Sequence, residues 1–441
     1  MSTPESTSAP ESTSAPESTS APESTSAPES ESSWDVVVVG GSIAGCATAI
    51  RFSRMGHRVA LLDRKTMDDG HHKRLCTHFI QPHAVPLLAG LGLDHLYGPE
   101  WSVRTKAVFV TPGGVVEGPG LSYDPDQPGA HALNLERRVL DPALRESARR
   151  HGVEYLDGTG VESIGRDGSD WFLDTDGDRG PRRFRARLVV AADGRRSRLA
   201  KELGNPAESR PNERAALFGY FSGITTRADQ RSVFVMHERD LACAYPLPGG
   251  RTQLVLFADK ARVEGWGGAD NRMREFLAYF DGLPDAPSTA GAVPEGGLLG
   301  YADYPSLLRE PVVDSVPFVG DAALSLDPMS GVGCGFALVS ADLLASSFAD
   351  RSLSEDDREA GLAEYRERYS RVLLPHAEGI CVDSLVGKDE TSRRRMFETI
   401  SADPELSRRY LALTGRMTLP AEFQRLFMRA LMTRRRPAVK R

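Results

Sequence analysis

The sequence predicts an α/β fold that carries a second, antiparallel sheet domain and a helical C-terminal region. Three observations lead to this prediction. Residues 34–45, WDVVVVGGSIAG, join a short apolar run to a glycine-rich turn, which is typical of a buried parallel strand that enters a helix. Between residues 213 and 257 apolar side chains recur with a period of two, as in antiparallel strands. From residue 355 onward the chain is charged and helical in pattern.

The N-terminal segment differs from the rest of the chain in composition. Residues 1–33 repeat the hexapeptide PESTSA and contain nothing apolar larger than Ala after Met1. Such a segment cannot offset the entropy lost on ordering, so we expect a disordered tail. The tail carries six Glu and no Lys or Arg, so it accounts for most of the net charge of −7. The remaining residues are nearly neutral, which gives no electrostatic reason to expect a nucleic-acid partner.

Cysteine usage and hydropathy indicate the cellular setting. The five cysteines form no C-x-x-C pair, which argues against a disulfide scaffold and a thiolate zinc site and favours the cytoplasm. The loop after residue 63 holds several His side chains and Cys76, but their spacing matches no zinc pattern, so we predict no metal. The sequence shows no positively charged segment followed by an apolar core and no apolar run of about 18 residues, so we predict neither a signal peptide nor a membrane span.

The first glycine-rich turn predicts a dinucleotide site. Gly40, Gly41 and Gly45 lead into an expected helix at residues 43–55, whose N-terminus would attract a pyrophosphate. The next strand, residues 58–63, ends on Asp63, where a carboxylate would accept hydrogen bonds from a ribose. Ser42 replaces the middle glycine of G-x-G-x-x-G. This Rossmann-like unit alone allows either NAD or FAD.

A second anchor lies far along the chain. An expected strand at residues 316–319 ends in Gly320 and Asp321, and Gly331, Gly333 and Gly335 then open an apolar helix. A carboxylate at a strand end followed by a glycine-rich helix N-terminus suits a polar, anionic ligand. A dinucleotide long enough to need two anchors in one sheet explains both features, and this favours FAD.

The other elements follow from local patterns. We expect helices at residues 83–91 and 272–280, and a hairpin at residues 103–116 with its turn at 112–114. Residues 133–150 predict one amphipathic helix, entered through Asn134 or Glu136. Residues 153–164, 171–174 and 184–192 read as strands, and the antiparallel sheet is expected to expose one face. The basic C-terminal segment could touch a membrane or a partner helix, but a docked helix is the preferred interpretation.

Three motifs now stand in order: GGSIAG with Asp63, the DG pair of Asp193 and Gly194, and GDAALSLDPMSGVGCG from residue 320. Together they resemble the FAD-dependent monooxygenases of the para-hydroxybenzoate hydroxylase family, the group A flavoprotein hydroxylases, over residues 34 to about 345. The resemblance implies a glutathione-reductase-type FAD-binding domain at residues 34–105, 131–205 and 300–350. It also implies a substrate domain at residues 106–130 and 206–299, with a helical region at 351–441.

The resemblance further implies an activity. FAD would be reduced by transiently bound NAD(P)H, would react with molecular oxygen to give a flavin C4a-hydroperoxide, and would hydroxylate or epoxidise a small apolar or aromatic substrate, as in natural-product biosynthesis. The first turn and Asp63 would hold the ADP half of FAD, Asp321 the ribityl chain, and Arg137 of R-x-x-L-D the flavin or its phosphates. The residues implied at the cofactor are Gly40, Gly41, Ser42, Ala44, Gly45, Asp63, Arg64, Arg137, Asp193, Gly320, Asp321, Pro328, Gly331, Val332 and Gly333.

Candidate catalytic residues and alternative functions remain open at this point. His78, Tyr220 and Tyr245 lie in segments that could line the cleft. The hydroxylases usually carry other residues where Leu324, Asp327 and Gly335 stand in this chain. The pair Asp327 and Pro328 resembles the sequence found at this place in flavin-dependent halogenases and in the geranylgeranyl-reductase group. Two further segments, the loop of residues 73–76 and YPLP at residues 245–248, resemble motifs of the reductases. The alternatives are therefore a reductase, a halogenase or a non-catalytic FAD-fold binding protein.

Overall fold

The computed structural model describes residues 31–66, 71–124, 127, 129–178, 180–385 and 389–434. Residues 1–30 of the predicted tail and the basic residues 435–441 lie outside this description. The first strand, β1 (Glu31–Val39), already includes the last three residues that we assigned to the tail, because they pair with β11 (Arg182–Ala191).

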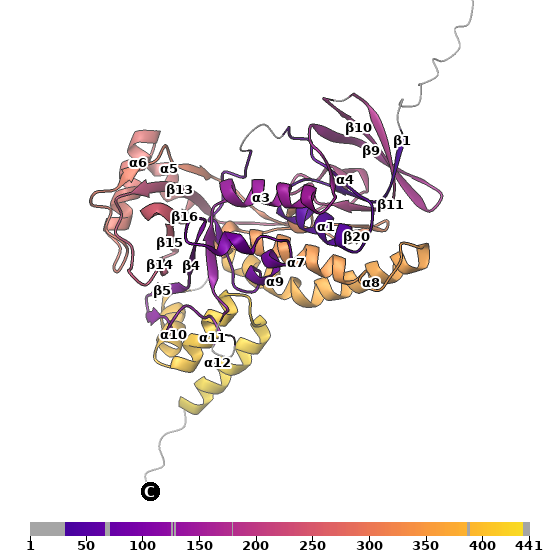
Figure 1. Ribbon diagram of the computed structural model, residues 1–441. Coiled ribbons are helices and arrows are strands. Elements are labelled where there is room, and N and C mark those ends of the chain that lie inside the picture. Colours follow the sequence, from indigo (N-terminus) through magenta and orange to yellow (C-terminus); the bar gives the residue numbers. More distant parts are fainter. Residues whose placement is uncertain are drawn as a thin grey trace, which may run out of the picture.

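A six-stranded sheet forms the part of the molecule drawn on the right of Figure 1. β1 lies inside it, parallel to β11 on one side and to β2 on the other, and Val36, Val37 and Val38 are fully buried. This burial explains why the strand is apolar on both faces. The strand order is β8 (Glu154–Leu156), β2 (Val59–Leu62), β1, β11, β10 (Asp170–Gly177) and β9 (Thr159–Asp167). The strand expected at 153–164 is therefore two strands, β8 and β9, in different positions of the sheet.

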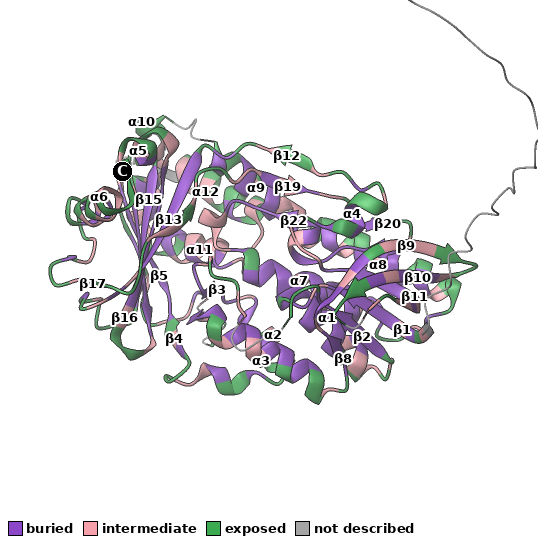
Figure 2. Ribbon diagram, turned by 90° about the horizontal axis from the view of Figure 1, so that it is seen from above, coloured by how far each residue is buried: buried purple, intermediate pink, exposed green. Residues whose placement is uncertain are grey.

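Helices from distant parts of the chain pack beside this sheet. The expected helix after the first turn is confirmed as α1 (Ile43–Arg54), which contacts both α7 (Gly333–Ser346) and α3 (Arg137–Arg150). The segment before α7 reaches the sheet because Phe318 forms a parallel bridge with Ala191, at the carboxyl end of β11. The two predicted anchor segments therefore lie at the same edge of one sheet, and Figure 2 shows the helices that follow them, α1 and α7, side by side from above.

The second large sheet has eight strands and lies on the left in Figure 1. Its order is β17 (Val293–Pro294), β13 (Arg214–Ser222), β16 (Arg251–Asp259), β15 (Asp240–Leu247), β14 (Ser232–His237), β5 (Ala107–Thr111) and β6 (Gly114–Val116), and β18 (Leu299–Tyr301) also pairs with β13. The pairing is antiparallel except between β14 and β5, which run parallel. The predicted hairpin exists only as β5 and β6.

The expectation that this sheet exposes one face is wrong. On one face, α5 (Lys260–Gly265) and α6 (Ala269–Asp281) contribute to an apolar cluster that includes Phe276 and Phe280. On the other face, Phe397 and Leu411 from the C-terminal helices join the apolar cluster that contains Phe218. The period-two pattern therefore reflects two different buried faces rather than one buried face and one solvent-exposed face.

A three-stranded sheet connects the two halves and corrects another prediction. It has the order β3 (Phe79–Ile80), β7 (Ala132–Leu135) and β4 (Ser102–Thr105). The helix expected from residue 133 begins only at Arg137, and Glu136 precedes it with extended backbone angles. All four residues of β7 are buried between β3 and β4, so tertiary pairing overrides the helical pattern there.

The remaining elements are short or C-terminal. Short elements are α2 (Val85–Ala89), α4 (Arg198–Glu202), β12 (Glu208–Arg210), β19 (Ser306–Leu308), β20 (Val312–Val313), β21 (Val316–Pro317) and β22 (Leu324–Ser325). The C-terminal helices are α8 (Glu355–Val372), α9 (Leu374–Ser384), α10 (Glu390–Ser401), α11 (Pro404–Thr414) and α12 (Pro420–Arg434). As expected, α12 is docked, through the buried Phe423. Within the described ranges, no helix is both long and apolar enough to cross a membrane.

Candidate active site

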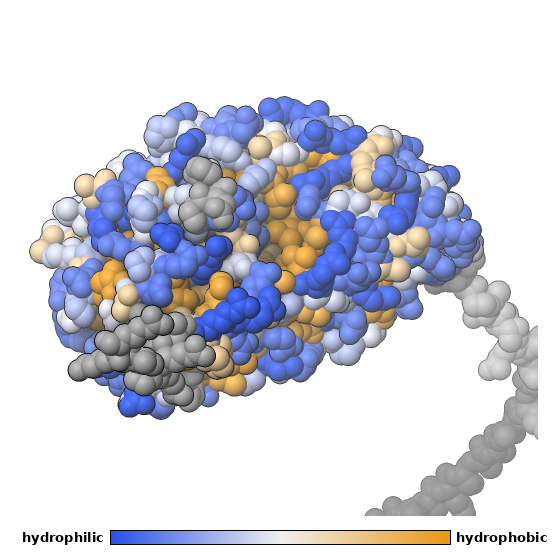
Figure 3. Space-filling view, turned by 90° about the horizontal axis from the view of Figure 1, so that it is seen from below, coloured by the Kyte–Doolittle hydropathy of each residue, from blue (hydrophilic) through white to orange (hydrophobic). Residues whose placement is uncertain are grey.

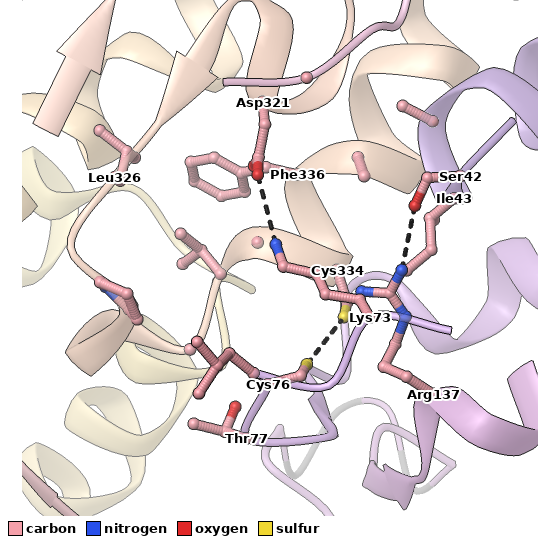
Figure 4. Close-up of a pocket in the computed structure, with 18 of the residues that line it drawn as sticks. Ser42, Ile43, Lys73, Cys76, Thr77, Arg137, Asp321, Leu326, Cys334 and Phe336 are labelled. Atoms are coloured by element: carbon pink, nitrogen blue, oxygen red, sulfur yellow. Dashed lines mark hydrogen bonds and ion pairs between the residues drawn. The ribbon is translucent and has the colours of Figure 1, made fainter. Parts of the chain in front are cut away.

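A cavity of about 240 Å³ lies where the two halves of the molecule meet. Its walls come from the first turn, residues 73–79, the start of α3, the end of β11, the inner face of the eight-stranded sheet and the segment from Asp321 to α7. Figure 4 shows a close-up of a pocket lined by these segments. Seen from below, apolar side chains gather in a strip between two mainly polar lobes (Figure 3). The cavity therefore joins the predicted cofactor turns to an apolar wall.

The first turn has the geometry that a phosphate needs. Gly40 has φ +109°, and a Cβ added there would lie 2.3 Å from the carbonyl oxygen of Ala192. A Cβ at Gly45 would lie 1.8 Å from the carbonyl oxygen of Gly40, so the turn and α1 can approach closely only with glycine at both positions. Ser42 and Ala44 line the cavity at the N-terminus of α1, where backbone N–H groups and the helix dipole favour an anion.

Arg137 reaches this turn from α3. Its Nη2 donates to Ser42 Oγ at 3.0 Å, and its Nε donates to Asp141, one helical turn later. Arg137 is only 3% exposed and Asp141 6%, so the two charges are buried as a pair. The carboxylate of Asp141 also accepts from the backbone N–H of Lys73 at 3.0 Å. Asp141 thus fixes the guanidinium at the cavity wall and ties the 73–79 loop to α3.

Asp63 lies behind the turn, at the end of β2. Its Oδ2 accepts from the Tyr155 hydroxyl at 3.2 Å and its Oδ1 from the backbone N–H of Lys65 at 3.1 Å. A Cβ at Gly41 would lie 2.6 Å from Asp63 Oδ2, so the carboxylate stands directly beside the turn. Its neighbour Arg64 is exposed.

Asp193 has a different place from the one expected of a cofactor ligand. Its neighbours Ala192 and Gly194 line the cavity, whereas its own Oδ2 accepts from the backbone N–H of Leu199 at 3.1 Å, in the first turn of α4. Burial raises the pKa of this carboxyl group. The DG pair therefore shapes the cavity through its backbone, with Asp193 holding the loop to α4.

The second anchor carries an ion pair inside the cavity. Asp321 Oδ2 lies 3.4 Å from Lys73 Nζ, and Figure 4 shows this pair reaching across the pocket. The Asp321 carboxylate raises the pKa of Lys73, so the lysine stays charged. Gly320, with φ +58°, lets the strand end approach α1, since a Cβ there would lie 2.7 Å from Ala44 Cβ.

The N-terminus of α7 forms the adjoining wall. Gly331 adopts a left-handed conformation with φ +63°, and Pro328, Gly331, Val332 and Gly333 all line the cavity. Because α7 has 14 residues, its dipole adds to the exposed N–H groups of its first turn. The site therefore has two helix N-termini, those of α1 and α7.

Two of the three positions where this chain departs from the hydroxylase pattern, Asp327 and Gly335, have structural roles. Asp327 is 1% exposed; its carboxylate accepts from Met329 N at 3.0 Å and from Ser384 Oγ at 2.9 Å, which joins the turn before α7 to the end of α9. Burial raises the pKa of Asp327. Gly335 lies against His83, since a Cβ would stand 3.0 Å from its ring. These substitutions therefore fit local packing.

The wall opposite the turns is apolar and aromatic. Phe79, Phe218 and Tyr301 line it, and each belongs to or packs against the apolar cluster on the inner face of the eight-stranded sheet. The Tyr301 hydroxyl is buried and has no hydrogen-bond partner among the described residues. Tyr304, beside it, shares a hydrogen bond with Ser325 Oγ at 3.0 Å. Tyr301 therefore adds a hydroxyl without a hydrogen-bond partner to this wall.

Two of the catalytic candidates face a neighbouring cavity of about 290 Å³. His78 Nδ1 accepts from the backbone N–H of Arg137 at 3.0 Å, so the ring hydrogen lies on Nε2, which is 2.5 Å from the Tyr220 hydroxyl. Charged side chains line this second cavity together with Leu298 and Leu299. Glu136 accepts there from both Arg138 and Arg251, and although burial opposes it, these partners lower the pKa of Glu136.

Tyr245 does not line the cleft as expected. It is 1% exposed and packs between Phe79 and Phe234 in the core of the eight-stranded sheet, where burial raises its pKa. The structure instead brings Lys73, Cys76, Cys334 and Tyr301 to the cavity. In the sequence, the loop of residues 73–76 is notable only for its similarity to the reductases, and no pattern assigns a role to Tyr301 or Cys334, although Cys334 lies within the glycine-rich motif.

The structure shows no group of three or more His, Cys, Asp or Glu side chains suited to a metal ion in the residues it describes.

Comparison with known proteins shows which family this chain resembles. A sequence profile described as FAD binding domain matches residues 33–255. Digeranylgeranylglycerophospholipid reductase 2 of Methanopyrus kandleri is 28% identical over 348 residues, which are 76% of this chain and 82% of that protein.

Two solved structures share the fold. The p-nitrophenol 4-monooxygenase PnpA from Pseudomonas putida superposes with a TM-score of 0.71 at 22% identity, over 88% of this chain and 99% of that one. The flavin-dependent brominase Bmp2 superposes with a TM-score of 0.71 at 18% identity, over 91% and 99%. At these identities the superpositions establish the architecture, while the reactions belong to those proteins.

Proposed function

The chain belongs to the family of proteins built on this FAD binding domain, and on that premise we propose that it is a monooxygenase. It would consume NADH or NADPH and molecular oxygen, and transfer one oxygen atom to a small apolar or aromatic molecule. FAD as the cofactor and a flavin-dependent oxidoreductase as the class of enzyme, both predicted from the sequence, are confirmed by the family match and the relatives.

The residues around the cavity fit FAD. The glycine turn leaves room that any Cβ would fill, and the two helix N-termini of α1 and α7 suit a pyrophosphate at one end and the polar edge of a flavin at the other. In this proposal Arg137 and Ser42 hold the phosphates, Asp63 accepts from the adenosine ribose, and Asp321 accepts from the ribityl hydroxyls. Lys73 would then exchange its pairing with Asp321 for the phosphates.

When bound, FAD would take a hydride from the nicotinamide and deliver the electrons with which molecular oxygen is activated. The protein's part is to position the substrate and to exclude water. Phe79 and Phe218 provide an apolar surface for an aromatic or aliphatic substrate. The Tyr301 hydroxyl can donate to a substrate hydroxyl or carbonyl oxygen and so fix its orientation in the cavity.

One observation carries this proposal: the apolar wall, which includes Tyr301 with its unpartnered hydroxyl, lines the same cavity as the FAD anchors. A substrate held there would meet the flavin away from bulk water. This arrangement suits transfer of oxygen to a phenol-like molecule, because a hydrogen bond that the phenolic O–H donates to the Tyr301 oxygen would both orient the ring and increase its electron density.

Reduction of a carbon–carbon double bond is the second candidate. Cys334 places a thiol in the same cavity, its pKa is raised by burial and by its hydrogen bond to Cys76, and a protonated thiol can donate the proton that such a reduction requires. The similarity to an archaeal lipid reductase points in the same direction. The reductase would bind an isoprenoid chain along the apolar wall.

Oxygen dependence separates the two candidates. Purified full-length protein loaded with FAD is incubated with NADH or NADPH and either 4-nitrophenol or digeranylgeranylglycerophospholipid, with and without air. The monooxygenase predicts an oxygenated product from the phenol only in air, with oxygen consumed alongside the nicotinamide. Formation of a saturated lipid without air, and no phenol product, would instead establish the reductase.

A further inference from the structure

Two cysteines from opposite ends of the fold meet inside the cofactor cavity. Cys76 lies in the loop before β3, and Cys334 is the second residue of α7. Their sulfur atoms are 3.7 Å apart, and both side chains line the cavity, as Figure 4 shows. The separation in sequence is 258 residues, so the contact depends on the folded arrangement of the two segments.

The two thiols have different surroundings and different acidities. The Cys334 thiol donates to Cys76, and this hydrogen bond lowers the pKa of Cys76, assisted by the backbone N–H of His78 at 3.3 Å and by the charge of Arg137. The same hydrogen bond and burial raise the pKa of Cys334. The contact therefore favours the thiolate, which is the reactive form, at Cys76 and a protonated thiol at Cys334.

The other three cysteines have no such arrangement. Cys46, Cys243 and Cys381 are buried, and burial raises the pKa of each of them. Cys46 donates to the backbone oxygen of Gly41, and Cys243 and Cys381 lie in separate apolar clusters. Buried, protonated thiols react slowly with oxidants. Only the 76/334 pair, among the five cysteines, combines a thiol of lowered pKa, a neighbouring thiol and a cavity.

We propose that Cys76 and Cys334 form a peroxide-reactive pair that closes reversibly into a disulfide across the cofactor cavity. The oxidant is hydrogen peroxide, which a reduced flavin forms with oxygen when no substrate takes the oxygen atom. The proposal concerns an oxidation of the protein itself. It therefore holds for either candidate reaction of the flavin site.

The chemistry takes place in two steps. The Cys76 thiolate attacks one oxygen of hydrogen peroxide, the O–O bond breaks, and the leaving hydroxide takes a proton to become water, so that Cys76 becomes a sulfenic acid. The Cys334 sulfur then attacks the Cys76 sulfur, the S–O bond breaks, and the Cys334 proton leaves with the hydroxyl group as a second water. The two sulfurs together lose two electrons, which reduce one peroxide to two waters.

The disulfide would alter the cofactor site in a defined way. Cys76 is three residues from Lys73, whose side chain pairs with Asp321, and Cys334 lies beside Gly333 at the N-terminus of α7. A covalent bond would therefore fix the loop with Lys73 to the helix that forms the opposite wall. Reduction by a dithiol would release it.

Peptide mapping tests the proposal directly. Full-length protein loaded with FAD is treated with hydrogen peroxide without substrate, its remaining thiols are blocked with N-ethylmaleimide, and the digest is analysed by mass spectrometry. We expect a cross-linked peptide pair containing Cys76 and Cys334, loss of two of the five free thiols, and recovery of both after dithiothreitol. The Cys381→Ser variant, which keeps the pair, should give the same cross-link.

Single variants of the pair identify the order of the steps. Cys334→Ser should leave Cys76 as a sulfenic acid that dimedone labels, whereas Cys76→Ser should leave Cys334 unlabelled. Five free thiols in the treated wild-type protein would overturn the proposal. So would a 76/334 cross-link that forms only after the protein is unfolded in urea. Both of these results come from the wild-type chain and do not depend on the folding of a variant.

Discussion

Removing the charge of Asp141 should destabilise the protein and make its stability depend strongly on FAD. In the Asp141→Asn variant the guanidinium of Arg137, which is 3% exposed, loses its carboxylate partner. In the wild type the Asp141 carboxylate also accepts a hydrogen bond from the backbone N–H of Lys73 at 3.0 Å. In the variant the NH₂ group of the new amide can face this N–H, so that two donors oppose each other. Breaking a buried ion pair on one side costs about 3–5 kcal/mol. We expect a loss of this size in the free energy of unfolding without FAD.

FAD should reduce this loss. Its pyrophosphate would supply the negative charge that Arg137 lacks in the variant, so added FAD should raise the stability of Asp141→Asn by more than that of the wild type. Urea titrations followed by tryptophan fluorescence measure this, because Trp34 and Trp171 are buried in the sheet that carries the first turn. The double variant Arg137→Met with Asp141→Asn should recover most of the stability without FAD.

Two results would refute this reasoning. If the double variant is as unstable as Asp141→Asn, the loss does not arise from an unpaired Arg137. If FAD stabilises the wild type and Asp141→Asn equally, then Arg137 does not meet the anionic part of the cofactor. Asp342→Asn is a suitable control, because Asp342 and Arg51 form a partly exposed ion pair between α7 and α1. Its loss should change the free energy of unfolding by less than about 1 kcal/mol.

Three further predictions concern separate parts of the site. Asp321→Asn should weaken FAD binding by roughly 10-fold to 100-fold, because a charged hydrogen bond contributes about 1.5–3 kcal/mol, and equal flavin retention by both proteins on dialysis would contradict the assignment. Tyr301→Phe should lower kcat/KM for a hydroxylated substrate roughly fivefold, corresponding to about 1 kcal/mol, and leave FAD affinity unchanged; a loss of flavin instead would move Tyr301 to the cofactor. Burial lowers the pKa of His83 to about 3 and that of His376 to about 4. Below pH 6.5 the unfolded chain binds more protons than the folded one at both positions, so stability should fall as the pH drops from 6.5 towards 4. His83→Gln should flatten this dependence in urea titrations at a series of pH values, and an unchanged slope would contradict it.

Much of the cofactor side could be predicted because its signals are local. The first turn, the helix after it and Asp63 at the end of β2 occupy a short stretch of sequence, and the spacing of the glycines indicates the close approach of the turn to α1. The same holds for Asp321 and the N-terminus of α7. The structure places all of these at one sheet edge because parallel strands end at the same side.

The contacts across the cavity could not be predicted, because they join distant segments of the chain. Lys73 and Asp321 are 248 residues apart, and Tyr301 reaches the cavity only through the pairing of β18 with β13. No periodic pattern marks such contacts. For a similar reason β7 was mistaken for the start of α3: four buried residues are too few to show a period, and the helical pattern after them is strong.

Transfer of an oxygen atom is the central claim, and isotopic labelling tests it most directly. Full-length protein with FAD and NADH or NADPH is supplied with 4-nitrophenol under isotopically heavy dioxygen, and the product is analysed by mass spectrometry. The proposal predicts one heavy oxygen atom in each product molecule and one nicotinamide oxidised for each product formed. A product whose new oxygen comes from water, or heavy oxygen recovered only as hydrogen peroxide, would contradict it.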